Sequence, residues 1–100
     1  MGERLREAAA ASGVAVADLP GGGTAFSVGD TTVAVASADG SSAEFRLDPA
    51  VAAAARRTPD TSASERGADW VRFRPPDLDG HAIDRAVAWL GSAARRVERG

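Results

Sequence analysis

Residues 67–97 read GADWVRFRPPDLDGHAIDRAVAWLGSAARRV, and this stretch decides the fold. Its first part alternates as a β-strand does, which would place Trp70, Arg72 and Arg74 on one face of a sheet and Val71 and Phe73 on the other. Two consecutive prolines then end the strand, because proline cannot donate to the sheet ladder. Beyond them, apolar residues recur at the spacing of a helix lying on a sheet. This stripe comprises Ile83, Ala86, Val87, Leu90, Ala94 and Val97.

Three more strand-like segments come earlier in the chain. They are Thr24–Val28, Thr31–Ser37 and Ala43–Leu47. Gly29-Asp30 and Asp39-Gly40 separate them, and such dipeptides favour tight hairpin turns. The segments therefore predict a three-strand antiparallel meander. Its inward-facing pairs are expected to be Phe26 with Val28, Val33 with Val35, and Phe45 with Leu47.

Two further helices are indicated by their end signals. Alanine-rich residues 3–12 end at Gly13, a residue favoured just past a helix C-terminus. Asp48-Pro49 suits an N-cap followed by proline at the first helical position, which predicts a helix over residues 49–57. Asp77 or Asp79 is expected to cap the final helix. Residues 58–68 read as a loop with a short edge strand at 62–65.

This order, α-β-β-β-α-(β)-β-α, predicts an α+β fold: an antiparallel sheet with helices packed on one face. One hundred residues suit a single domain spanning residues 1–100. Within it we expect a helix and a flexible glycine-rich entry at 1–22, the core at 23–97 and a tail at 98–100.

Composition excludes several classes of protein. The chain has no Cys, so it can form neither a disulfide framework nor a thiolate zinc site. A net charge of −2 gives no global attraction to nucleic acid or to an anionic membrane. All 12 cations are Arg, which indicates a GC-rich, bacterial host. Without a leader, or an apolar run of the roughly 20 residues that span a bilayer, a cytoplasmic location with no membrane partner is expected.

Candidate chemistry is sparse. His81 has Asp77 and Asp84 at helical spacing, but a site with one nitrogen ligand is weak, and capping explains these acids. We therefore predict no metal and no cofactor. No Gly-x-Ser-x-Gly elbow accompanies the histidine, so no catalytic residue is assigned. Residues 20–24 lack the Gly-Lys-Ser/Thr ending of a phosphate loop and predict a hinge.

One surface remains, made by Trp70, Arg72 and Arg74 with Arg46 on a neighbouring strand. Guanidinium groups bind phosphates and an indole stacks on a base, so this set fits nucleic acid. If helices cover the face of Val71, the arginines could instead be simply solvated, with Trp70 against an arginine stem. If helices cover the other face, Val71 and its neighbours would form an apolar patch for a protein partner.

Four segments resemble the MmcQ/YjbR family over roughly residues 23–97. They are Phe26-Ser27-Val28-Gly29-Asp30, Thr32–Ala36, Phe45-Arg46-Leu47-Asp48-Pro49 and Gly67-Ala68-Asp69-Trp70-Val71. The resemblance implies a CyaY-like α+β sandwich and a double-wing DNA-binding domain.

A second resemblance is to the small luciferase-like domain family. It is carried by Gly13-Val14, Gly22-Gly23-Thr24-Ala25-Phe26, Val28-Gly29 and Trp70-Val71-Arg72-Phe73. That family usually has His in the loop before the Trp, where this chain has Thr61-Ser62-Ala63-Ser64.

The sequence thus predicts a small non-catalytic binding module that contacts nucleic acid through Arg46, Trp70, Arg72 and Arg74. The alternative is a domain that binds a protein or a small ligand, with no nucleic-acid role. An enzyme is the third and least favoured interpretation. The oligomeric state is left open.

Overall fold

Residues 1–99 form an α+β domain of three helices and one six-stranded sheet. Our computed structural model describes residues 1–99, with side chains as far as Glu98. The elements are α1 (Gly2–Ser12), β1 (Ala15–Asp18), β2 (Thr24–Val28), β3 (Thr31–Ala36), β4 (Ala43–Arg46), α2 (Pro49–Ala55), β5 (Thr61–Ser64), β6 (Gly67–Phe73) and α3 (Gly80–Arg99). The predicted class and order are confirmed, and β1 adds a strand ahead of the meander. Gly100, in the segment assigned to a tail, lies outside the described residues.

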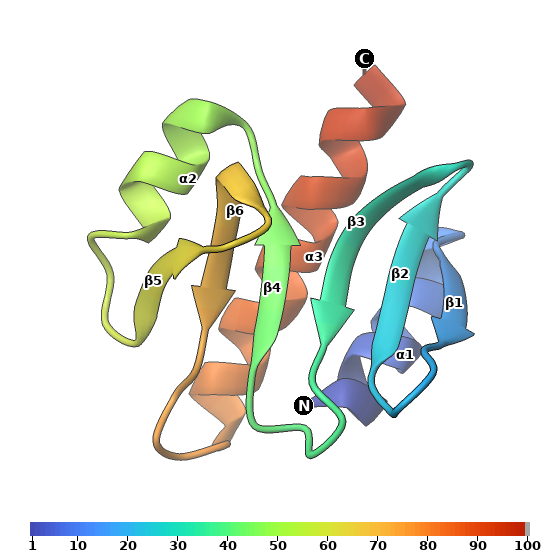
Figure 1. Cartoon of the computed structure of the whole chain (residues 1–100), viewed down its shortest axis with the longest axis horizontal. Coiled ribbons are helices and arrows are strands. Elements are labelled where there is room, and N and C mark those ends of the chain that lie inside the picture. Colours follow the sequence, from blue (N-terminus) through green and yellow to red (C-terminus); the bar gives the residue numbers. More distant parts are fainter. Residues whose placement is uncertain (100) are drawn as a thin grey trace.

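The sheet is antiparallel throughout, with strand order β1-β2-β3-β4-β6-β5. Figure 1 shows α1 and α3 lying side by side behind it. The face turned toward the viewer is left uncovered by the described helices, and we call it the open face. Among residues 1–99, no helix has the length and apolarity that crossing a membrane requires.

Local signals position the elements as expected. Gly29 adopts a φ of 59° in the two-residue turn between β2 and β3, a left-handed conformation that glycine adopts without steric cost. Asp48 and Pro49 begin α2. Of the two acids considered for α3, Asp79 is the cap, because its Oδ1 accepts the N–H of Ala82 at 2.9 Å.

The core lies between the sheet and the helices. A row of cross-strand neighbours on β2, β3, β4 and β6 faces the helices and is fully buried: Phe26, Ala34, Phe45 and Val71. Trp89 of α3 packs edge-on to Phe73, with ring centroids 4.9 Å apart. Leu5, Ala9 and Val14 belong to the same cluster, so the N-terminal segment adds to the core.

The prediction that Val35 faces inward is wrong. The β2–β3 register shifts between Phe26 and Ser27, which leaves Val33 as an extra residue on β3. Such a bulge lets two consecutive residues share a face, so Val33 and Ala34 are both buried in the core. Val35 then pairs with Ala25 and Glu44 and lies outside the core cluster.

The stripe predicted for α3 also differs from the buried side of the helix. Ile83 lies outside the core cluster, whereas Ala93 is fully buried and Trp89 packs against the core. Helical spacing alone fits several rotations of α3. The observed rotation is fixed by Trp89, which fills the space beside Phe45 and Phe73.

Two glycines of the β1–β2 loop have a packing role. A Cβ on Gly22 would lie 2.7 Å from Cβ of Ala38, and a Cβ on Gly23 would lie 2.9 Å from the carbonyl oxygen of Ala36. The loop is also hydrogen-bonded, since Leu19 N–H donates to the Gly23 carbonyl at 3.1 Å. The glycines therefore allow close backbone approach between this loop and the end of β3.

Candidate functional site

The residues predicted for binding lie on the open face, over β4 and β6. Val71 and Phe73 are fully buried under the helices, so the alternate residues Trp70, Arg72 and Arg74 project from the opposite side. Arg46 is the cross-strand partner of Trp70. We call these four residues together with Arg66 the arginine surface. Of the two faces considered in the sequence analysis, the helices therefore cover the one that carries Val71 and Phe73.

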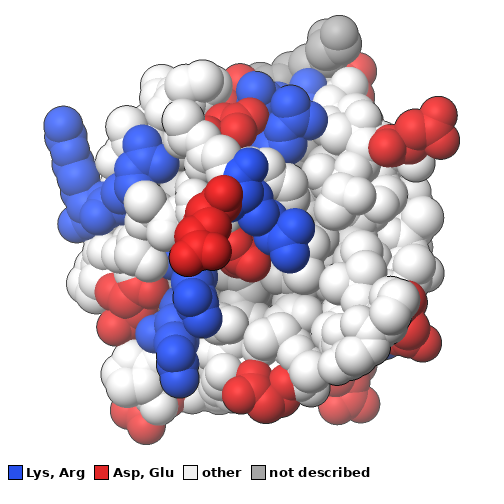
Figure 2. Space-filling model, in the orientation of Figure 1, with Lys and Arg blue, Asp and Glu red and all other residues white. Residues whose placement is uncertain are grey.

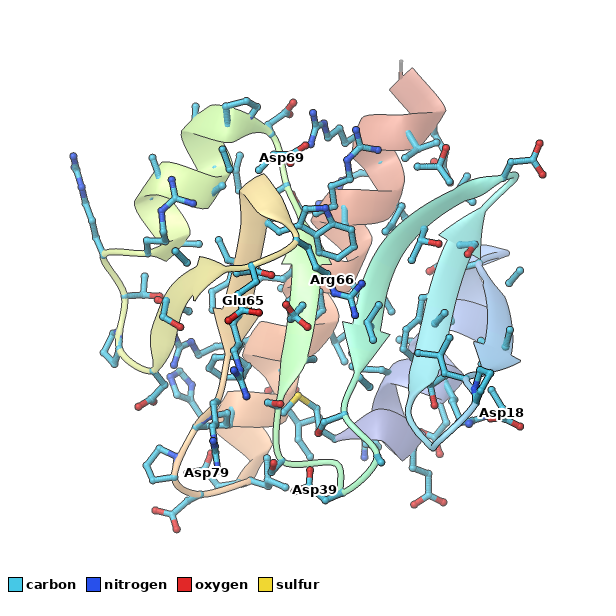
Figure 3. The ribbon with its side chains drawn as sticks, viewed as in Figure 1. Asp18, Asp39, Glu65, Arg66, Asp69 and Asp79 are labelled. Carbon is cyan, nitrogen blue, oxygen red and sulfur yellow. The ribbon has the colours of Figure 1, made fainter. Side chains whose placement is uncertain are left out.

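Arg46 is held in an ion-pair network at one end of β6. Its Nε lies 3.1 Å from Oδ2 of Asp69, and Arg96 Nη1 lies 2.9 Å from the same oxygen (Figure 3). Arg96 also donates to the Leu47 carbonyl at 2.6 Å and approaches Asp48 at 3.6 Å. The network joins α3 to β4 and β6, so the charge of Arg46 is already compensated.

The carboxyl group of Asp69 has a lowered pKa. Desolvation acts to raise it, but hydrogen bonds from Arg96 and Arg46 outweigh that effect and hold the pKa below its ordinary value. A folded-state pKa below the unfolded one means that ionised Asp69 stabilises the fold above the unfolded pKa of about 3.9. That stabilisation is lost as the pH falls through the folded-state pKa.

Asp69→Asn should consequently lower the free energy of unfolding by about 1–3 kcal/mol at neutral pH, because it removes charge-assisted hydrogen bonds. Below a pH of about 4 the variant should lose stability less steeply than the parent, since one fewer carboxylate has to be protonated. Urea denaturation at a series of pH values measures both. Parallel profiles for parent and variant would contradict the role given to Asp69.

Arg66 joins the surface from the turn between β5 and β6, although it was not predicted from the sequence. Its guanidinium carbon lies 5.6 Å from the centroid of the Trp70 ring, within cation–π range, and its Nε lies 3.1 Å from Oε1 of Glu44 (Figure 3). Ser64 donates its hydroxyl to the other oxygen of that carboxylate. An arginine therefore lies over part of the Trp70 ring, in agreement with the alternative in which Trp70 packs against an arginine.

Arg72 and Arg74 differ from the other arginines of the surface. Both are exposed, and neither makes an ion pair or hydrogen bond through its guanidinium to any described residue. Arg72 has Glu44 as its cross-strand neighbour. Arg74 lies close enough to Asp39 to act on its carboxyl, whose pKa is lowered first by hydrogen bonds from Ser41 and Ser37 and also by this charge.

The open face is divided by charge. In Figure 2, basic and acidic side chains interleave over the half that contains β4 and β6, while the half over β2 and β3 is almost free of charge. Ala25 and Val35 lie on that second half. The arginine surface thus carries both signs, and Arg72 and Arg74 are its two guanidiniums that form no ion pair with a described residue.

The remaining sequence candidates do not form a site. His81 is exposed at the start of α3, and no group of three His, Cys, Asp or Glu side chains within residues 1–99 could hold a metal ion.

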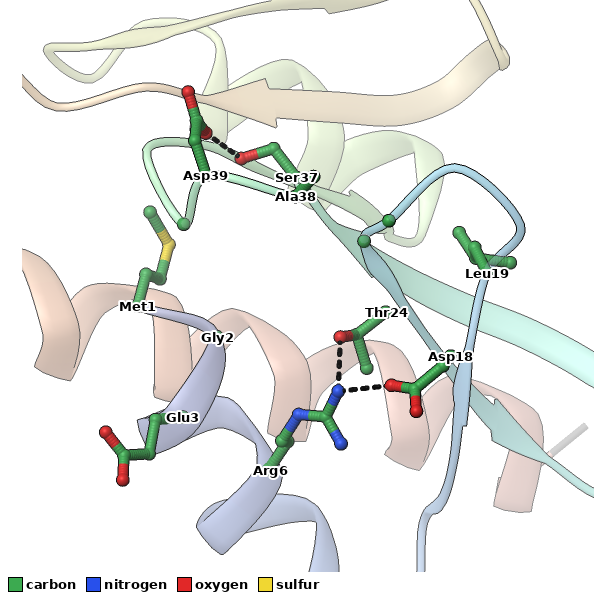
Figure 4. Close-up of a pocket in the computed structure, with 13 residues that line it drawn as sticks. Met1, Gly2, Glu3, Arg6, Asp18, Leu19, Thr24, Ser37, Ala38 and Asp39 are labelled. Carbon is green, nitrogen blue, oxygen red and sulfur yellow. Dashed lines mark hydrogen bonds and ion pairs between the residues drawn. The ribbon is translucent and has the colours of Figure 1, made fainter.

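A hollow of about 520 Å³ lies between the start of α1 and the β1–β2 loop (Figure 4). Its cation, Arg6, already donates to Asp18 at 2.5 Å and to Thr24 at 2.9 Å.

Comparison with known proteins leaves the site to be judged on its own geometry. No family model, curated protein or solved structure matches the chain.

Proposed function

We propose that this protein is a small non-catalytic module that binds nucleic acid on the arginine surface. The observation that carries the proposal is the position of Arg72 and Arg74. Both follow the alternation of β6 onto the open face, Arg72 within the strand and Arg74 directly after its end, and neither forms an ion pair with a described residue. Trp70 lies on the same face, two residues before Arg72, where its indole is available for stacking once Arg66 moves aside.

The charge of this surface determines the kind of binding expected. Two guanidiniums without ion pairs contact few phosphates, so binding should be weak, insensitive to base sequence and strongly reduced by salt. Arg46 and Arg66 add to it only if the ligand competes with Asp69 and Glu44 for them. The resemblance to the MmcQ/YjbR family, with its double-wing DNA-binding domain, supports DNA as the ligand. A cytoplasmic location in a bacterium is part of the same proposal.

Fluorescence anisotropy with labelled single- and double-stranded DNA over a range of salt concentrations tests the proposal. Arg72→Ala with Arg74→Ala should weaken binding about tenfold at low salt. It should also reduce the slope of log K against log salt by about two, one for each lost phosphate contact.

The matched control is Arg4→Ala with Arg57→Ala, which removes the same formal charge from two exposed residues, one on α1 and one in the turn after α2. This control should bind DNA nearly as the parent does, because it keeps Arg72 and Arg74, which are expected to contact the phosphates. Binding by the parent that ignores salt, or equal loss in both double variants, would contradict the proposal.

A protein partner is the second candidate function, and the uncharged half of the open face favours it. Ala25 and Val35 are paired there, and Figure 2 shows few charged side chains over β2 and β3. A surface with few charges is suited to another protein rather than to phosphates. This candidate predicts no salt-sensitive binding of DNA, so the anisotropy experiment separates the two.

A further inference from the structure

A second hollow lies between α1 and α3, on the helical side of the molecule and away from the open face. Its volume is about 370 Å³, within the range of about 300–1,000 Å³ common for small-molecule sites. Both helices contribute to its wall, together with Val14 from the segment after α1. The side chains of Val14, Val87 and Leu90 make the wall largely apolar, and Ser12 and Arg95 are its polar members.

Gly91 helps to keep this groove open, although the fold itself has no need of a glycine there. Glycine within a helix costs about 1 kcal/mol relative to alanine. A Cβ at Gly91 would meet only the flexible end of Arg95, at 3.2 Å from Nη1, and no backbone atom within 4 Å outside its own helix turn. Its backbone φ is also not in the left-handed range. Close packing within the domain therefore does not explain this glycine, whereas an occupied groove would.

Arg95 supplies the only charge in the wall of the groove among the described residues. Its guanidinium lies across Gly91 and makes no ion pair or hydrogen bond with a described residue. No Asp or Glu among the described residues lines the groove. An apolar trough with one free cation at its edge complements a molecule that has an apolar chain and one anionic group, because each part meets its preferred surroundings.

We propose that this groove binds a medium-chain carboxylate. Its alkyl chain lies against Val87 and Leu90 in the space beside Gly91, and its carboxylate accepts hydrogen bonds from Arg95. This site uses no residue of the arginine surface, so a test of carboxylate binding is independent of a test of nucleic-acid binding.

Titration of the ¹⁵N-labelled protein with octanoate, followed by amide NMR, tests the proposal. Saturable shifts are expected at Val14, Val87, Gly91 and Arg95. Arg95→Gln should weaken octanoate binding about tenfold while leaving 1-octanol binding unchanged, since the alcohol lacks the charge that the arginine recognises. Arg4→Gln, which removes the same charge from the exposed side of α1, is the control and should bind octanoate as the parent does.

Gly91→Leu gives a second test, because its side chain would fill the groove and should abolish the shifts from both ligands. Circular dichroism checks that this variant is folded, and if it is not, Arg95→Gln alone decides. The proposal is overturned by octanoate shifts that do not saturate or that map to the open face. It is equally overturned if Arg95→Gln binds octanoate as tightly as the parent.

Discussion

Phe45→Ala should lower the free energy of unfolding by about 3–5 kcal/mol, a large part of the roughly 5–15 kcal/mol typical of a whole domain. Phe45 is fully buried on β4 and has Ala34 and Val71 as its cross-strand neighbours. The Trp89 ring lies 6.0 Å away, centroid to centroid. The cost should be near the upper end, because its cross-strand neighbour Ala34 is too short to fill the cavity that the ring would leave.

Chemical denaturation measures the loss, and Val51→Ala is its control. Val51 is 37% exposed on α2, so its truncation should change the free energy of unfolding by no more than about 0.5 kcal/mol. Similar midpoints for Phe45→Ala and the parent would show that the sheet does not bury this ring under α3.

Leu90→Ala is expected to cost about 2–5 kcal/mol, because Leu90 anchors α3 on the sheet. The side chain is 2% exposed and belongs to the single core cluster, together with Ala86 and Ala94 of the same helix. The small neighbours again limit how far the structure can collapse into the space that is left. The measurement is the shift in the denaturant midpoint at an unchanged slope.

Leu78→Ala makes the same chemical change just before α3, at a residue that is 43% exposed. It should leave the midpoint almost unchanged. If the two leucine variants lost stability equally, the rotation of α3 described above would be incorrect.

Much of the fold could be predicted from sequence because its signals are local. The alternation around Trp70, the Gly29-Asp30 turn and the Asp48-Pro49 helix start each depend on residues close together in the chain. Together they were enough for the α+β class and the element order.

The errors arose where distant segments meet. No residue near Val35 in the sequence indicates a bulge, and the register shift becomes visible only in the pairing of β3 with β2. The rotation of α3 depends on the space beside Phe73 that Trp89 fills. The sequence alone was compatible with more than one register of β3 and more than one rotation of α3, and tertiary packing selects one of each.

The candidate site could be predicted only in part, because local alternation places its strand residues but not their contacts with distant segments. The sequence placed Trp70, Arg72 and Arg74 on one face and named Arg46 as a neighbour, and the pairing of β4 with β6 brings them together. It could not show that Asp69 compensates Arg46, because those contacts join β4, β6 and α3. Arg96 near the end of α3 is a further example, because its contacts with the Leu47 carbonyl and with Asp69 also join segments that are distant in the sequence.

The central claim is that the arginine surface binds nucleic acid, and an amide NMR titration with short DNA at low and at moderate salt tests it most directly. The claim predicts shifts at Trp70, Arg72, Arg74 and their neighbours on β4, which shrink as salt is added. An absence of shifts at millimolar DNA, or shifts that persist unchanged in moderate salt, would contradict it.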